Sequence, residues 1–132
     1  MLEKMYEEVK RINEYSYSPY SNYRVSACIL AKDGSLISAI NVENASYGLS
    51  MCAERSALFK AISLGYKPND FLKIMIYTNR LDSMPYPCGA CLQVISELMG
   101  LDADVIIVND NHQFEIHKVK DMLPYAFLKE NL

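Results

Sequence analysis

Two short cysteine motifs are the part of this sequence most able to do chemistry. Cys88 and Cys91 are three positions apart in "PCGAC", and Cys52 lies in "CAE" with Glu54 two residues further along. A C-x-x-C pair at a helix start is also the thioredoxin-like arrangement, and a second such pair would indicate structural zinc, but the chain has none. The function of the pair therefore depends on which other residue could bind the same metal ion.

Cys52 is the candidate that completes a metal site. Cys52 and Cys88 are each predicted to stand at the start of a helix, where partial positive charge lowers the pKa of a thiol. Three thiolates leave the fourth tetrahedral position open for water, which is typical of catalytic rather than structural zinc. Glu54 can lie beside the ion without binding it and handle the protons of that water. Cysteines, a glutamate and P-C-x-x-C in this combination are the signature of zinc deaminases.

The sequence around these motifs resembles the homotetrameric type of cytidine deaminase along nearly its whole length. The matching segments are "SPYSNYRVSA", "NVENASYGLSMCAERSALFKAI", "PCGACLQVISEL" and "MLPYAF". The resemblance implies zinc-dependent hydrolysis of cytidine and 2'-deoxycytidine to uridine and 2'-deoxyuridine with release of ammonia, as in pyrimidine salvage. It also implies one Zn2+ per subunit, bound by Cys52, Cys88 and Cys91, with Glu54 as the proton shuttle.

The resemblance implies roles for residues outside the cysteine motifs as well. Asn41 and Glu43 in "NVEN" match the pair that holds the ribose hydroxyls, and an amide with a carboxylate can donate to and accept from a diol. Tyr23 matches an aromatic position, usually phenylalanine, that packs near the nucleoside. Ala53 would offer backbone hydrogen bonds to the pyrimidine edge. Phe127 matches a phenylalanine that stacks over the base from a neighbouring subunit.

Two further positions concern the electronics and the surroundings of the metal. Arg55 matches an arginine that hydrogen-bonds a thiolate, which withdraws charge and restores some of the Lewis acidity of a zinc ion held by three thiolates. The alternative for Arg55 is a surface charge on its helix. Ser26 and Cys28 in "VSAC" depart from the small-residue run with glycine that the family usually has. We expect Cys28 to be a buried, inert thiol.

Periodicity predicts the elements that must position these residues. Apolar spacing indicates an amphipathic helix over residues 1–15, and two apolar strands flank the turn Asp33-Gly34. Further helices are predicted at both cysteine motifs, and further strands at 71–79 and on either side of "NDNH". This order favours an α/β fold, a mixed sheet of about five strands sandwiched by helices. With the resemblance, it predicts a single cytidine/deoxycytidine deaminase domain over residues 1–132.

Composition limits the classes of function. A chain of 132 residues with 51% apolar residues can build one domain with a substantial core. A net charge of -3 with scattered Lys and Arg is a poor footprint for nucleic acid, and no run of ~18 apolar residues indicates a membrane span. The N-terminus lacks the apolar region of a signal peptide, so we expect reduced thiols and a cytoplasmic location. The expected partners are a small nucleoside and, through shared active sites, other copies in a homotetramer.

Two alternatives stay open at this point. One is a deaminase with another substrate, either a blasticidin-type aminonucleoside or a nucleic acid. A nucleic-acid editing enzyme needs a basic channel and stacking loops, against which charge and length argue, whereas "NVEN" favours a simple ribose over the aminonucleoside. The other alternative is a thiol redox or non-catalytic zinc-binding protein. Glu54 discriminates here, because neither role needs a carboxylate beside the metal.

Overall fold

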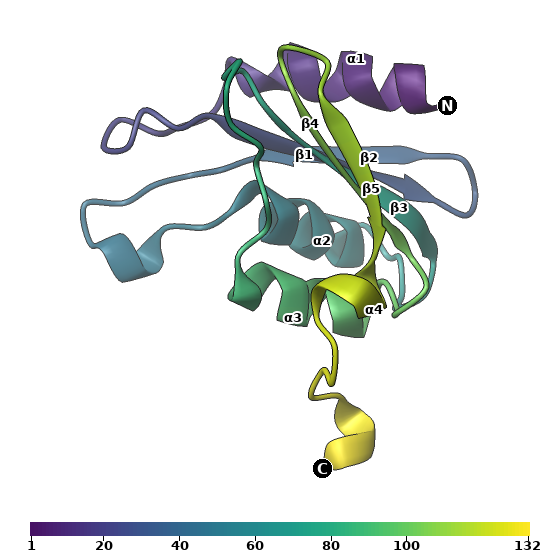
Figure 1. Ribbon diagram of the computed structural model, residues 1–132. Coiled ribbons are helices and arrows are strands. Elements are labelled where there is room, and N and C mark those ends of the chain that lie inside the picture. The colour runs from purple at the N-terminus through teal and green to yellow at the C-terminus, as the bar shows by residue number, and fades with distance from the viewer.

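A five-stranded mixed sheet forms the centre of the protein, with helices on both faces, in the computed structural model, which describes residues 1–132 (Figure 1). The strand order is β2-β1-β3-β4-β5, with bounds Leu36–Ile40, Val25–Ala31, Phe71–Thr78, Asp104–Asn109 and Phe114–Lys118. β3 and β4 run parallel, and the other neighbouring pairs are antiparallel. The predicted α/β fold with about five mixed strands is confirmed.

Helices form the two outer layers. α1 lies on one face of the sheet, while α2 and α3 lie on the other (Figure 1). Their bounds are Leu2–Asn13, Ala53–Ser63 and Gly89–Leu98; the short α4 (Val119–Met122) follows β5, and single 3-10 turns span Tyr47–Leu49 and Lys129–Asn131. The C-terminal tail leaves α4 and points away from the body of the subunit (Figure 1).

The β1–β2 hairpin forms where the sequence predicts it. Gly34 adopts a φ of 89°, in the left-handed region that favours glycine, so the chain can reverse within a few residues. A carboxylate oxygen of Asp33 accepts the backbone N–H of Ser35 at 3.0 Å and closes the turn. The register then places Leu30 opposite Leu36.

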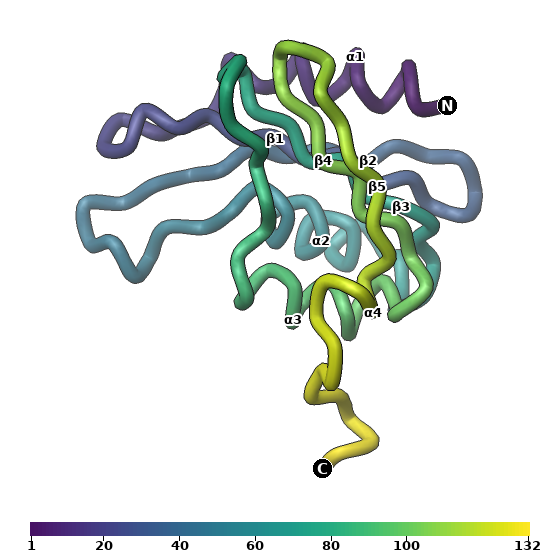
Figure 2. Tube along the Cα trace, viewed as in Figure 1, coloured from purple at the N-terminus to yellow at the C-terminus, as the bar shows by residue number.

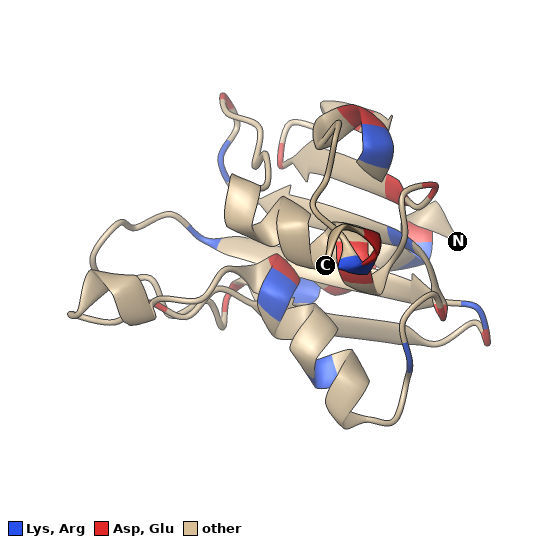
Figure 3. Ribbon diagram, turned by 90° about the horizontal axis from the view of Figure 1, so that it is seen from below, with Lys and Arg blue, Asp and Glu red and all other residues tan.

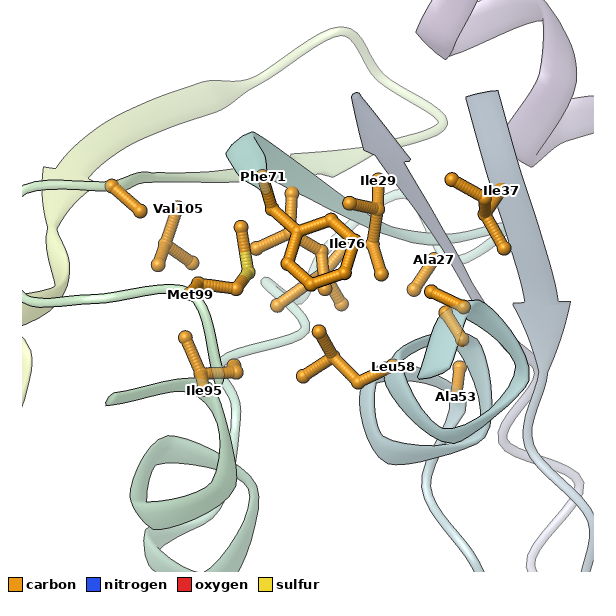
Figure 4. Packing of buried hydrophobic residues seen from close by; sticks show 14 of the residues in the cluster. Ala27, Ile29, Ile37, Ala53, Leu58, Phe71, Ile76, Ile95, Met99 and Val105 are labelled. Atoms are coloured by element: carbon orange, nitrogen blue, oxygen red, sulfur yellow. The ribbon is translucent and has the colours of Figure 1, made fainter. Parts of the chain in front are cut away.

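Most of the apolar core lies between the sheet and the α2–α3 layer. Ile29, Leu58, Ile76 and Ile95 meet there from both layers (Figure 4). A smaller cluster under α1 fills the opposite face, so β1, which has helices on both sides, has every residue buried. The buried face of α2 extends only as far as Ala61, because Ile62 is 37% exposed and Leu64 lies beyond the helix end at 62% exposed.

Both cysteine-bearing helices begin at the same end of the sheet. The segment 41–52 leads from β2 to the start of α2, and the segment 79–88 leads from β3 to the start of α3 (Figure 2). α2 and α3 also pack against each other. Motifs far apart in the sequence are brought together in this way.

The surface carries charges of both signs, interspersed over the helices and loops (Figure 3). No face seen in this view gathers lysine and arginine into a continuous stripe. None of the helices combines the length and the apolar composition that crossing a bilayer requires.

Candidate metal and nucleoside site

Three cysteines converge where the two helices begin. Cys52 is the N-cap of α2, Cys88 is the N-cap of α3, and Cys91 lies in the first turn of α3. Their sulfur atoms all lie within 4.8 Å of one another. Four-coordinate zinc with bonds of ~2.3 Å to sulfur needs sulfur atoms roughly 3.8 Å apart, so the three side chains can bind one ion with small adjustments.

The chemistry of the three sulfurs also fits zinc. Hydrogen bonds from the Cys91 thiol and the Arg55 guanidinium lower the pKa of Cys52 to about 5, against the opposing effect of its burial. The hydrogen bond to Cys52, together with burial, raises the pKa of Cys91. Soft thiolate donors select zinc over magnesium or calcium. The donor set therefore suits the ion that the sequence predicts.

Arg55 lies against this cluster. Its Nη2 donates to the sulfur of Cys52 at 3.7 Å, and that contact raises the pKa of the guanidinium. The Nε atom of Arg55 is buried without a hydrogen-bond partner. The guanidinium thus contacts the sulfur of Cys52, as the resemblance implies.

Glu54 is the buried carboxylate of the site. It stands in the first turn of α2 and is only 4% exposed. Burial, with the nearby charge of Cys52 as a smaller cause, raises the pKa of Glu54 to about 7. A carboxyl group with a pKa near neutrality can both accept and release a proton at physiological pH.

A pocket of about 500 Å³ opens beside Glu54, within the range of small-molecule sites. Every predicted site residue lines it except Cys91, which is buried, and Phe127. The members supplied by the sequence prediction are Tyr23, Asn41, Glu43, Cys52, Ala53, Glu54, Arg55 and Cys88. The fold thus gathers three separate stretches of chain around one cavity.

Asn41 and Glu43 are held in place by the loop before β1. The amide Nδ2 of Asn41 donates to the carbonyl of Tyr23 at 2.8 Å. The carboxylate of Glu43 accepts the backbone N–H groups of Tyr20 and Ser21, each at 3.1 Å, and the hydroxyl of Ser21. Led by the Ser21 hydroxyl, these bonds lower the pKa of Glu43, so the pocket contains a preorganised anion.

Tyr23 is half-buried in the pocket wall, and burial raises its pKa. The guanidinium of Arg80 lies over its ring, 4.7 Å from the centroid. The sequence prediction missed Arg80, and it missed Pro85 and Tyr86, which line the pocket just before Cys88. Pro85 and Tyr86 could have been found from their proximity to the C-x-x-C motif, whereas a lone arginine in a loop gives no signal.

Phe127 lies outside the pocket of its own chain. Its side chain is 58% exposed, and its carbonyl accepts a hydrogen bond from the side-chain amide of Gln93 at 2.6 Å. It belongs to the tail that points away from the subunit (Figure 1). Its stacking on a base bound by a neighbouring subunit stays a prediction.

The fold and the site define a zinc-binding deaminase, and the comparisons agree. Residues 1–108 match the family described as the cytidine and deoxycytidylate deaminase zinc-binding region, and the chain belongs to this family. It is 43% identical over 125 residues to a cytidine deaminase from Halalkalibacterium halodurans, covering 95% of this chain and 92% of that one. The crystal structure of cytidine deaminase from Burkholderia pseudomallei matches with a TM-score of 0.92 at 39% identity, over 96% of this chain and 99% of that one.

A second kind of deaminase matches over a shorter stretch. Blasticidin-S deaminase from Bacillus cereus is 32% identical over 82 residues, which is 58% of this chain and 59% of that one. The similarity to cytidine deaminases is thus both higher and more complete.

Proposed function

We propose that this protein, as a single domain spanning residues 1–132, hydrolyses cytidine and 2'-deoxycytidine to uridine and 2'-deoxyuridine and releases ammonia. The observation that carries the proposal is a buried carboxylate, Glu54, beside three converging cysteine sulfurs in a pocket of nucleoside size. The cytidine deaminases that align over nearly the full chain support the same reaction.

Zinc would be held by Cys52, Cys88 and Cys91, and when bound it supplies Lewis acidity that lowers the pKa of water toward neutrality. Glu54 accepts a proton from the attacking water and delivers it to N3 of the cytosine ring, which makes C4 electrophilic. After oxygen adds to C4, Glu54 passes a proton to the departing amino group. The products are uridine and ammonia, so the two transfers balance with the consumption of one water.

The rest of the pocket orients the nucleoside. Asn41 and Glu43 bind the ribose hydroxyls, Ala53 offers backbone groups to the pyrimidine edge, and Tyr23 packs near the nucleoside. The position of Glu43 supports this assignment, because three hydrogen bonds keep its carboxylate charged and fixed at the pocket wall. Arg55 withdraws charge from the sulfur of Cys52 and so limits the loss of acidity that three thiolates cause.

We further propose a homotetramer in which neighbouring subunits close each active site. Large apolar side chains are exposed beside the pocket and in the tail: Tyr47 is 88%, Leu49 71% and Phe127 58% exposed. Closed homo-oligomers can cover such a pocket with a symmetry-related copy, each subunit giving what it receives. Excluding bulk water strengthens the electrostatics of Glu54 and the metal. Light scattering should give about four times the 15.0 kDa of the chain.

We also propose that the enzyme acts in the cytoplasm, in pyrimidine salvage. Ligand thiols must stay reduced, which suits the cytoplasm, and recovery of uridine from cytidine suits pyrimidine salvage. We propose a free nucleoside rather than a nucleic acid as the substrate, and the net charge of -3 and the interspersed charges in the view of Figure 3 support this.

One set of assays tests the proposed function. The purified protein should contain about one zinc per chain and should turn cytidine into uridine, followed by ultraviolet absorbance. The alternative functions are tested in parallel, with blasticidin S and cytosine-containing single-stranded DNA as substrates and with a dithiol–disulfide exchange assay. Turnover of any of these with none of cytidine would refute the proposal.

A further inference from the structure

The segment 79–87 forms one wall of the site, although it contains no helix or strand. Arg80 at its start lies over the ring of Tyr23, and Pro85 and Tyr86 near its end line the pocket. The residue that follows the segment is Cys88, the N-cap of α3. The position of this segment therefore affects both the nucleoside pocket and the cysteines of α3.

Asn109 holds the beginning of this segment. It is the last residue of β4, pairs with Thr78 in the register with β3, and has no exposed surface. Its side-chain Nδ2 donates to the carbonyl oxygen of Ser83 at 3.2 Å and, over a longer 3.5 Å, to that of Leu81. The backbone N–H of Asp110 adds a bond to the carbonyl of Arg80 at 3.1 Å.

The same amide also fixes the turn between β4 and β5. Nδ2 of Asn109 donates to the side-chain oxygen of Gln113 at 2.8 Å, and Oδ1 accepts the backbone N–H groups of Asn111 at 3.0 Å and Gln113 at 3.1 Å. The turn and the start of the segment lie side by side at one end of the sheet (Figure 2). One buried side chain thus ties the segment to the β4–β5 hairpin.

A second bond attaches the other end of the segment to the same hairpin. The hydroxyl of Tyr86 donates to Oε2 of Glu115 on β5 at 2.5 Å, and Oε1 of Glu115 contacts Nε2 of His117 at 2.7 Å. Tyr86 stands two positions before Cys88. The segment is therefore fastened to the hairpin at residues 80–83 and again at Tyr86.

We propose that Asn109 and Glu115 are positioning residues that set the pocket wall and the placement of the α3 cysteines through the segment 79–87. The inference rests on the proposed deaminase site, but neither residue lines the pocket or belongs to the cysteine cluster. Without these bonds, the segment has only one backbone hydrogen bond of its own, from Tyr86 to Met84. The consequence falls on Cys88, which is exposed and depends on the preceding chain for its place.

The test compares Asn109→Asp with Asn13→Asp. Both asparagines are buried, but Asn13 lies at the end of α1, where Nδ2 donates to the hydroxyl of Ser26 at 3.2 Å. Asn109→Asp keeps the acceptor bonds of the turn and loses the donor to the segment. It should release zinc to a chelator about tenfold faster than the wild type and change the visible spectrum of the cobalt-substituted protein. Asn13→Asp should lower the melting temperature and release zinc at the wild-type rate.

The kinetics should separate positioning from general damage. Because Glu54 is on α2, Asn109→Asp should raise KM for cytidine by more than it lowers kcat. Glu115→Ala should release zinc about threefold faster, and Glu115→Gln, whose amide oxygen still accepts from Tyr86, should restore the wild-type rate. If Asn109→Asp does not fold, the two Glu115 variants test the positioning role by themselves.

Three outcomes would each overturn the inference. The first is wild-type zinc release and KM in Asn109→Asp, and the second is equal acceleration of zinc release in both asparagine variants. The third is wild-type zinc release in Glu115→Ala. Zinc release and the cobalt spectrum need no substrate, so a wild-type protein without cytidine turnover would refute the proposed function and leave this comparison intact.

Discussion

The N-termini of α2 and α3 both present a cysteine, yet they are built differently. At α2, Ala53 and Glu54 are buried and the helix packs into the main core. At α3, Cys88, Gly89 and Ala90 are exposed, and the chain before them is irregular. If the proposed function holds, the difference implies a division of labour: α2 provides the buried carboxylate for proton transfer, while the two cysteines of α3 depend on neighbouring segments for their placement.

The chain before each helix supports the same contrast. Met51, directly before Cys52, forms a two-way backbone bridge with Val42, at 2.8 and 3.0 Å. Before Cys88 a single backbone bond, from Asp110 to Arg80, is joined by side-chain bonds from Asn109 and Glu115 of the β4–β5 hairpin. A backbone bridge survives most substitutions, whereas a side-chain tether is lost with a single one. Mutations should therefore affect the two helix ends in different ways.

The largest effect is expected at the α2 end. Glu54→Gln should keep the fold and the zinc but lower kcat by about 10⁴-fold or more, because the nearly isosteric amide cannot carry either of the two proton transfers. Cytidine turnover, metal analysis and circular dichroism together measure this. Near-normal turnover would remove Glu54 from the mechanism and with it the chemical role of α2.

Removing a sulfur ligand should have the second-largest effect. Cys52→Ala, Cys88→Ala and Cys91→Ala should each lose most of the zinc and at least about 100-fold in activity, because three sulfurs are the whole protein contribution to the ion. Zinc per chain by atomic absorption is the measurement. Full occupancy in Cys88→Ala alone would mean that the exposed α3 cysteine is no ligand.

Cys28→Ser is the control for these cysteine variants. Cys28 has no exposed surface, and burial raises its pKa to about 12, so it is an inert thiol packed under α1, as the sequence predicts. The variant should keep its zinc while losing about 1–3 kcal/mol of stability, since a buried hydroxyl replaces the thiol. Loss of metal here would show that the ligand set is misassigned.

The smallest effect concerns the cover of the site. Phe127→Ala should raise KM for cytidine by about 5- to 160-fold with zinc retained, because stacking on a base is worth ~1–3 kcal/mol. Phe114→Ala is the matched control: this phenylalanine is similarly exposed, at 63%, but it lies on β5, away from the tail. An unchanged KM in Phe127→Ala, or a fully active monomer, would refute the shared active site.

Local patterns explain what could be predicted from the sequence. Cys52, Glu54, Cys88 and Cys91 are close in the chain to helix starts and to each other in pairs, so their residue types and spacing, with the resemblance, indicate a zinc deaminase site. The elements were predictable because the apolar periodicity is strong and the turn at Gly34 has a clear signal. Periodicity could not show that the buried face of α2 ends at Ala61, because it does not reveal where a helix extends beyond the elements that cover it.

The sequence by itself determined the donor set, the carboxylate beside it and the order of the strands and helices, since these depend on residue type and local spacing. The tertiary structure decided what those residues can do together. It brought the sulfurs of α2 and α3 within 4.8 Å, buried Glu54 so that its pKa rises to about 7, and placed Arg80 over Tyr23. It also joined Asn109 to a segment 26 positions earlier, at Ser83. Such contacts depend on distances between segments that only the packed chain defines.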